Sequence, residues 1–163
     1  MSVAASVDSD AQLARLLQIG MVLEEVVEVR AHRHYQTLPA AERDEAIEDM
    51  LESARTESAE HRRRLESLVD ALDAEGVPID EIEDLVLAEY ANSEPTDFDG
   101  VLYDQLNGEE TAYKFYDDLV AAVEASDAHF GVDREELLAT LRELREDEAA
   151  GAEEVAELME ART

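Results

Sequence analysis

The residues that break helices are few in this sequence and gather at four places. These places are Pro39, Gly76 with Pro78, the segment from Pro95 to Gly100, and Gly131. Because proline and glycine interrupt helices, each long stretch between them is predicted to form one helix. The predicted helices run from Asp10 to Gln36, from Pro39 to Glu75, from Asp97 to Ser126, and from about Asp133 onward. The expected fold class is all-α.

The lengths of the connections predict how these helices are arranged. The connections near Pro39 and Gly131 are short, so the helices that flank each of them should be antiparallel neighbours. The segment from Gly76 to Thr96 is longer and is predicted to hold a short outer helix, because it carries the apolar run Ile79, Ile82, Leu85 and Val86. With 163 residues the chain suits a single domain, residues 1–163, in which a long crossover joins two hairpins.

The charge of the chain is strongly unbalanced, with 43 acidic and 13 basic residues and a formal net charge of −30. Such a field repels nucleic acids and anionic membranes, so neither is an expected partner. Lys114 is the only lysine, and this balance resembles the proteins of salt-accumulating halophiles. The N-terminal sequence lacks the basic start of a signal peptide, and a cytoplasmic location is therefore expected.

The sequence contains no cysteine, which excludes disulfides, thiolate metal sites and a catalytic thiol. It also shows no glycine-rich phosphate loop, Ser-His-Asp set or nucleotide fingerprint. Any bound metal must therefore use carboxylates and imidazoles as ligands.

Each predicted helix carries an apolar stripe that polar residues interrupt near mid-helix. The stripes are read at alternating steps of three and four residues, the spacing that faces a bundle core. In the first helix the stripe comprises Leu17, Met21, Glu24, Glu28, Ala31, Tyr35 and Leu38. The interruptions in the four helices are Glu28, Ser58 with His61, Glu109, and Glu148. Mid-helix positions of an antiparallel bundle lie at similar heights, so Glu28, His61, Glu109 and Glu148 are predicted to converge.

Such a convergence would be costly without a cation. Three buried carboxylates repel one another and lose their hydration, and a divalent metal ion removes both problems. Iron, manganese and zinc all accept mixed carboxylate and imidazole ligands, so the ligand types leave the metal open.

Several of the polar and aromatic residues also have simpler interpretations. Glu24 can be a stripe-edge residue that reaches water, and Tyr35 and Tyr116 can be core tyrosines with a satisfied hydroxyl group. The histidines outside the stripes are expected on the surface, namely His32, His34 and His129. The basic run of Arg62, Arg63 and Arg64 is expected to pair with nearby glutamates rather than to bind phosphate.

Two segments of the chain share one motif. Glu28-Val-Arg-Ala31-His-Arg-His34-Tyr35 and Glu109-Glu-Thr-Ala112-Tyr-Lys-Phe115-Tyr116 both read E-x-x-A-x-x-[FH]-Y. On this motif the chain resembles the rubrerythrin branch of the ferritin-like superfamily across nearly its whole length. The resemblance implies a ferritin-like four-helix bundle of two antiparallel hairpins joined by a long crossover.

The resemblance also implies a set of metal ligands. The family takes one glutamate from each motif helix and an E-x-x-H pair from each of the other two helices. Glu28 and Glu109 match the single glutamates, while His61 and Glu148 match one member of each pair. Ser58 stands where the first paired glutamate would be, and Gly151 where the second histidine would be. The expected cofactor is one or two iron or manganese ions, held best at Glu28, His61 and Glu148.

Two functions follow from these expectations. The first is a metal-binding protein that handles iron, peroxide or dioxygen, with ferroxidase- or peroxidase-type activity and electrons from an external donor. The second is a non-enzymatic bundle without metal that acts as a structural or interaction module. A homodimer is the assembly that the resemblance implies in either case.

Overall fold

The computed structural model describes residues 7–42, 44–72, 74, 84 and 98–161. Within these residues the chain forms α1 (Asp10–Thr37), the 3₁₀ helix η1 (Ala40–Glu42), α2 (Glu45–Ala71), α4 (Phe98–Ala125) and α5 (Arg134–Ala161), and no strand. The predictions of an all-α class and of four long helices are confirmed. The predicted short helix and crossover between Gly76 and Thr96 lie outside the described residues, apart from Asp84.

Helix α2 begins later than predicted. It was expected from Pro39, but η1 follows that proline and α2 starts only after Asp44. The side chain of Asp44 accepts a hydrogen bond from the backbone N–H of Ile47 at 2.9 Å, which satisfies one of the free donors of the first turn. At α5, the side chain of Asp133 accepts a hydrogen bond from the backbone N–H of Glu136 at 3.3 Å and caps the first turn in the same way.

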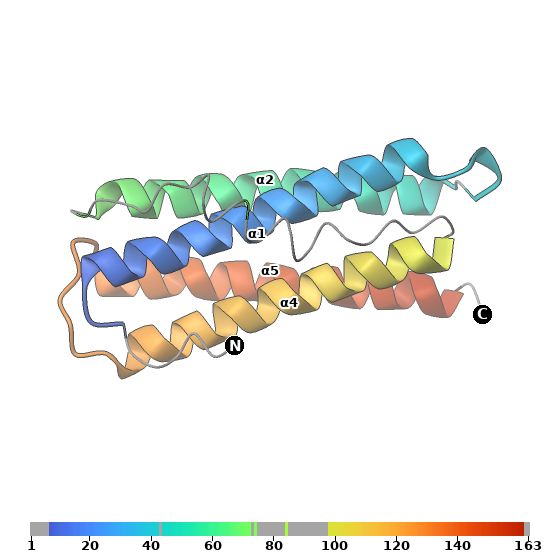
Figure 1. Cartoon of the computed structure of the whole chain (residues 1–163). Coiled ribbons are helices and arrows are strands. Elements are labelled where there is room, and N and C mark those ends of the chain that lie inside the picture. Colours follow the sequence, from blue (N-terminus) through green and yellow to red (C-terminus); the bar gives the residue numbers. More distant parts are fainter. Residues whose placement is uncertain (1–6, 43, 73, 75–83, 85–97, 162–163) are drawn as a thin grey trace.

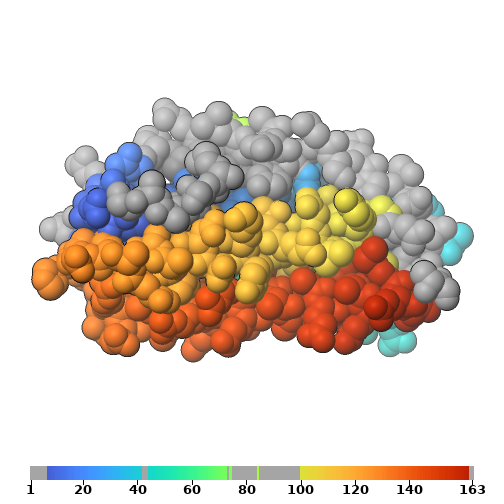
Figure 2. All heavy atoms as spheres, turned by 90° about the horizontal axis from the view of Figure 1, so that it is seen from below, coloured from blue at the N-terminus to red at the C-terminus, as the bar shows by residue number. Residues whose placement is uncertain are grey.

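The four helices form a bundle in which each helix lies against two others. Helix α1 packs on α2 and on α4, and α5 packs on α4 and on α2. Figure 1 shows that α1 and α2 run in opposite directions, as do α4 and α5. It also shows that α2 ends at the end of the bundle opposite to the start of α4. In Figure 2, α4 and α5 lie side by side along one face with their side chains closely packed.

The hydrophobic core is divided into two parts along the bundle axis. One cluster gathers around Leu13, Leu17, Leu65, Leu119 and Leu141. The other gathers around Leu38, Ile47, Leu51, Leu102 and Val155. On every long helix, buried polar residues lie between the two clusters in sequence: Glu24 on α1, Ser58 and His61 on α2, Glu109 on α4, and Glu148 on α5. The predicted mid-helix polar layer is therefore present.

Helix α1 turns a different face to the core from the predicted one. Leu17, Glu24, Ala31 and Leu38 are buried as predicted, and so are Gly20 and His34, whereas Met21 and Glu28 are half-buried and Tyr35 is exposed. The steps of three and four residues thus alternate in the opposite order. Gly20 explains part of this choice, because a Cβ at this position would lie 3.0 Å from Phe115 and 3.1 Å from Leu65. The small residue lets α1 approach its neighbours at this point.

Ion pairs between arginine and carboxylate side chains connect neighbouring helices across the surface. Arg62 on α2 pairs with Glu28 on α1, Arg64 on α2 with Glu143 on α5, and Arg145 on α5 with Asp117 on α4. The prediction that the run from Arg62 to Arg64 pairs with glutamates is confirmed, since Arg63 bonds Glu60. None of the described helices is long and apolar enough to cross a membrane.

Candidate metal centre

Three side chains from three helices meet in the polar layer of the core. Glu24, His61 and Glu148 each offer a ligand atom, and these atoms all lie within 4.8 Å of one another. The Nδ1 atom of His61 is 3.2 Å from Glu24 Oε1 and 3.1 Å from Glu148 Oε1. Ligand atoms around a metal with bonds of about 2.0–2.2 Å lie about 3–3.5 Å apart, so the spacing at His61 fits a metal ion.

Of the two oxygens of the Glu24 carboxylate, one has hydrogen-bond partners among the described residues and the other has none. Its Oε1 atom accepts a hydrogen bond from the hydroxyl group of Tyr116. Its Oε2 atom is buried and has no hydrogen-bond partner in the part of the chain that the structure describes. A buried carboxylate oxygen without a partner is costly, and a cation beside it would remove that cost. The residues present therefore fit a metal ion.

Glu109 forms the fourth side of this layer and lies directly against Gly151. Its side chain is buried and hydrogen-bonds Glu148. A Cβ on Gly151 would stand only 2.6 Å from Oε2 of Glu109 and 2.8 Å from its Cδ. The Glu109 carboxylate thus fills the space that a side chain at position 151 would otherwise occupy.

Asp147 contacts the candidate centre from outside. Its Oδ2 atom is 3.0 Å from Nε2 of His61, and its side chain is about half exposed at 47%. A carboxylate on the outer nitrogen of a ligand histidine fixes the ring orientation and raises its basicity. Asp147 is therefore suited to position His61 and to present Nδ1 to the interior.

The charges in this layer shift the pKa values of its members. Burial alone would lower the pKa of His61, but the hydrogen bonds and charges of Glu24, Asp147 and Glu57 outweigh burial and raise it to about 9. Burial and the charge of Glu24 raise the pKa of Glu148 strongly, and burial also raises that of Glu109. In the metal-free protein near neutral pH, these shifts favour the charged form of His61 and the protonated form of Glu148.

These pKa shifts predict that the metal-free protein becomes less stable as the pH rises. The pKa of Glu57 is raised by burial from 4.5 to about 7, and that of His61 from 6.5 to about 9. In both cases the folded state holds a proton that the unfolded state releases, so stability is highest below the unfolded pKa and falls through the folded one. We expect the free energy of unfolding to fall from about pH 4.5 to about pH 9.

Urea unfolding at a series of pH values, in a metal-chelating buffer, measures this dependence. The same series on His61→Gln isolates the upper part, because the two proteins share all of their carboxylates and differ only in the imidazole of residue 61. The difference between the two curves should shrink between about pH 6.5 and 9. A constant difference across that range would contradict a charged His61.

Of the four predicted ligands, His61 and Glu148 lie in one group of possible ligand atoms with Glu24, and Glu109 lies beside that group. His61, Glu109 and Glu148 lie in the buried layer, as their stripes predict. Glu28 lies one turn away, pairs with Arg62 at 2.8 Å, and is 26% exposed. Glu24 takes the place expected of Glu28 and is 1% exposed, so its interpretation as a water-reaching residue is wrong.

The sequence does contain a pattern that indicates Glu24. It is the stripe along α1 in which the steps of three and four residues are taken in the opposite order. That order places the apolar Val27 where the predicted order places the charged Glu28, and it keeps Glu24 in the stripe. It also turns His34 inward, so the surface location expected for this residue is wrong, and it leaves Tyr35 42% exposed. His32 and His129 are exposed as predicted.

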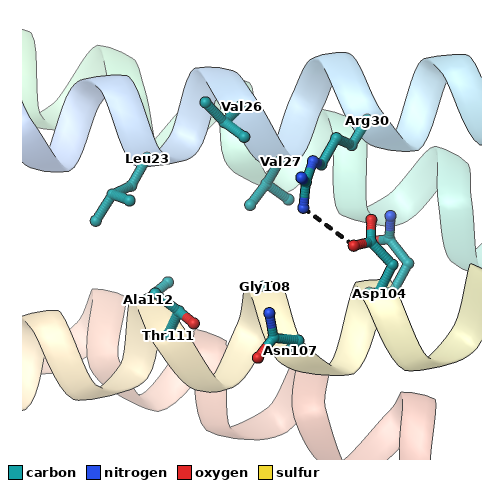
Figure 3. A pocket seen from close by; sticks show the side chains of 10 residues that line it. Leu23, Val26, Val27, Arg30, Asp104, Asn107, Gly108, Thr111 and Ala112 are labelled. Atoms are coloured by element: carbon teal, nitrogen blue, oxygen red, sulfur yellow. Dashed lines mark hydrogen bonds and ion pairs between the residues drawn. The ribbon is translucent and has the colours of Figure 1, made fainter. Parts of the chain in front are cut away.

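His34 belongs to a second polar cluster, between α1 and α4. Its Nδ1 atom is 3.2 Å from Nε2 of Gln105 and its Nε2 is 3.4 Å from Asp104, which also accepts a hydrogen bond from Arg30 at 3.0 Å. Burial lowers the pKa of His34 and outweighs the charge of Asp104, which raises it. Figure 3 shows Arg30 and Asp104 joined across a cavity whose other lining residues include Leu23, Val26 and Val27.

Comparisons with known proteins give no independent assignment of this centre. No family model, no curated protein and no solved structure matches the chain. The case for function therefore depends on the geometry and chemistry of the buried layer.

Proposed function

We propose that this chain is a ferritin-like protein, related to rubrerythrin, that binds one iron or manganese ion and handles iron, peroxide or dioxygen there. Its ligands are Glu24, His61 and Glu148. The opposed directions of neighbouring helices support the ferritin-like crossover arrangement, since a chain leaving α2 must travel the length of the bundle to begin α4.

The observation that carries the proposal is the unpartnered oxygen of Glu24 beside two further ligand atoms. Among the described residues, Glu24 Oε2 is buried without a hydrogen-bond partner, and the ligand group around it is 1–4% exposed. Two carboxylates and one imidazole suit iron or manganese and leave coordination positions open for a small molecule. Such an ion, when bound, supplies Lewis acidity and one-electron redox chemistry.

The protein's own residues hold the protons of this centre. Tyr116 donates to Glu24, and the protonated Glu148 hydrogen-bonds Glu109 and Glu24. Asp147 holds the outer nitrogen of His61. Redox turnover would draw electrons from an external donor, and a homodimer is the proposed assembly.

Metal analysis of the purified protein tests the proposal and separates the two candidate glutamates. We expect one iron or manganese ion per chain in the wild type and in Glu28→Gln, and almost none in Glu24→Gln. Both variants remove one negative charge from α1, so the comparison cancels the effect of net charge. Loss of metal in Glu28→Gln with retention in Glu24→Gln would show that the ligand on α1 is misassigned.

Metal affinity should also rise with pH, because ligands must lose their protons before they bind. The raised pKa values of His61 and Glu148 mean that protons are released when a metal binds. We expect Mn²⁺ titrations by calorimetry to show tighter binding at about pH 8.5 than at about pH 6.5. Titrations in buffers of different ionisation enthalpy would count the released protons, and a count of zero would contradict this ligand set.

A second function is favoured by one observation, the position of His61 between the carboxylates. A protonated His61 lies within hydrogen-bond distance of both Glu24 and Glu148 and can neutralise the layer without a metal. The chain would then be a metal-free ferritin-like bundle that serves as a structural or interaction module. Absence of stoichiometric metal from protein purified in concentrated salt, together with no uptake of added Fe²⁺ or Mn²⁺, would favour this function.

A further inference from the structure

The candidate metal centre is buried, so a cation must reach it through the surrounding helices. Along the bundle axis the way is closed on both sides by the two hydrophobic clusters described above. On the side of α4, Tyr116 covers Glu24 and is 1% exposed. An approach between helices therefore remains.

An open groove between α2 and α5 leads to the centre. It is lined by Glu52, Ser53, Thr56, Glu57, Glu60, His61, Arg63, Arg64 and Asp147. His61 is a proposed ligand, so this groove reaches the outer side of the centre. Asp147 lies between solvent and His61, since it is half exposed and 3.0 Å from Nε2.

The charges along this groove favour a cation. Four carboxylates line it against two guanidinium groups. Both arginines are engaged by carboxylates, Arg63 by Glu60 and Arg64 by Glu143. Glu57 is half-buried and near enough to His61, Asp147 and Glu109 to feel the charge of each. Two of the groove's carboxylates, those of Asp147 and Glu57, thus lie near His61.

The openings on the other sides are less suited to a cation. The groove between α1 and α2 is lined by three arginines, Arg55, Arg62 and Arg63, against two glutamates. The cavity between α1 and α4 is mostly aliphatic, and the Arg30 to Asp104 ion pair spans its polar end (Figure 3). Neither opening has the excess of carboxylates over guanidinium groups that lines the groove between α2 and α5.

We propose that the metal ion reaches the centre through the groove between α2 and α5, with Glu57 as the carboxylate that passes it to His61 and Glu148. This inference rests on the proposed metal-binding function and adds its route. Glu57 acts here as a positioning residue and not as a ligand of the final site. Its removal should therefore change the rate of metal uptake and leave the amount bound unchanged.

The test follows uptake of Co²⁺ by the metal-free full chain in a stopped-flow spectrophotometer, with equilibrium stoichiometry measured on the same samples. Glu57→Gln removes the relay carboxylate, and Ser53→Trp obstructs the groove with a bulky ring. Glu110→Gln and Asn107→Trp are matched controls on α4, away from this groove. We expect the association rate constant to fall about tenfold in the first two variants and to stay unchanged in the controls.

The outcomes separate the route from the function. Stoichiometric binding at the wild-type rate in both Glu57→Gln and Ser53→Trp would overturn the route while the metal site stands. Slower uptake in Asn107→Trp alone would place the route between α1 and α4. A wild-type chain that binds no Co²⁺ would overturn the metal site itself. Circular dichroism verifies that each variant is folded, and Glu57→Gln tests the route even if Ser53→Trp does not fold.

Discussion

Replacing His61 with alanine should abolish metal binding and destabilise the metal-free protein by about 3 kcal/mol or more. The reason is that His61 is the one basic group within hydrogen-bond distance of both Glu24 and Glu148 in the described part of the chain. Without it, the buried carboxylates lose their positive partner in the metal-free state and a ligand in the metal-bound state. Removing one partner of a buried ion pair costs more than the pair contributes, because the other charge stays buried.

Urea unfolding in chelating buffer measures the stability loss, and metal analysis measures the binding loss. His129→Ala is the matched control, because His129 is exposed in the connection before α5 and lies outside the buried layer. We expect this control to change stability by less than about 0.5 kcal/mol. If His61→Ala were as stable as the control, the buried carboxylates would have to be neutral through protonation alone, and the charge of His61 would not stabilise the layer.

The second large effect is expected at Gly151. Alanine normally stabilises a helix by about 1 kcal/mol relative to glycine. Helix propensity alone therefore predicts that Gly151→Ala makes the protein more stable. The structure predicts the opposite, because the new Cβ would stand 2.6 Å from Glu109 Oε2. Moving that buried carboxylate would break its hydrogen bond with Glu148, and overpacking of this kind costs about 1–3 kcal/mol.

Gly108→Ala provides the comparison on α4. Its Cβ would meet only Val27 Cγ2, at 3.5 Å, which is ordinary contact. We expect this variant to gain up to about 1 kcal/mol while Gly151→Ala loses stability, with both measured by urea unfolding. Equal gains in the two variants would show that the Glu109 carboxylate is not held against Gly151.

Much of the bundle could be predicted from residue patterns alone. Proline and glycine mark the ends of the helices because they disturb backbone geometry and hydrogen bonding locally. The stripes of α2 and α4 predicted that His61 and Glu109 are buried, because the two helices follow regular steps of three and four residues. The error at the start of α2 came from Pro39, which can begin a helix, whereas Asp44 caps the helix that forms.

The candidate site was predicted less completely. On α1 both orders of steps contain Leu17, Glu24, Ala31 and Leu38, and the choice between them depends on neighbouring helices. Gly20 accepts Phe115 and Leu65, and His34 meets Gln105, so contacts with α2 and α4 rotate α1. That rotation turns Glu28 toward Arg62 and Glu24 toward Tyr116. Local pattern could not decide it, because glutamates occupy both candidate positions.

The sequence by itself determined the helices, the antiparallel hairpin pattern of their connections, and a polar layer with His61, Glu109 and Glu148. These properties depend on backbone chemistry and on periodicity within one helix. Tertiary structure alone decided that Glu24 completes the ligand set, that Glu109 fills the space at Gly151, and that His61 opens toward the groove between α2 and α5. Each of these depends on how one helix is rotated against another, which packing between helices selects.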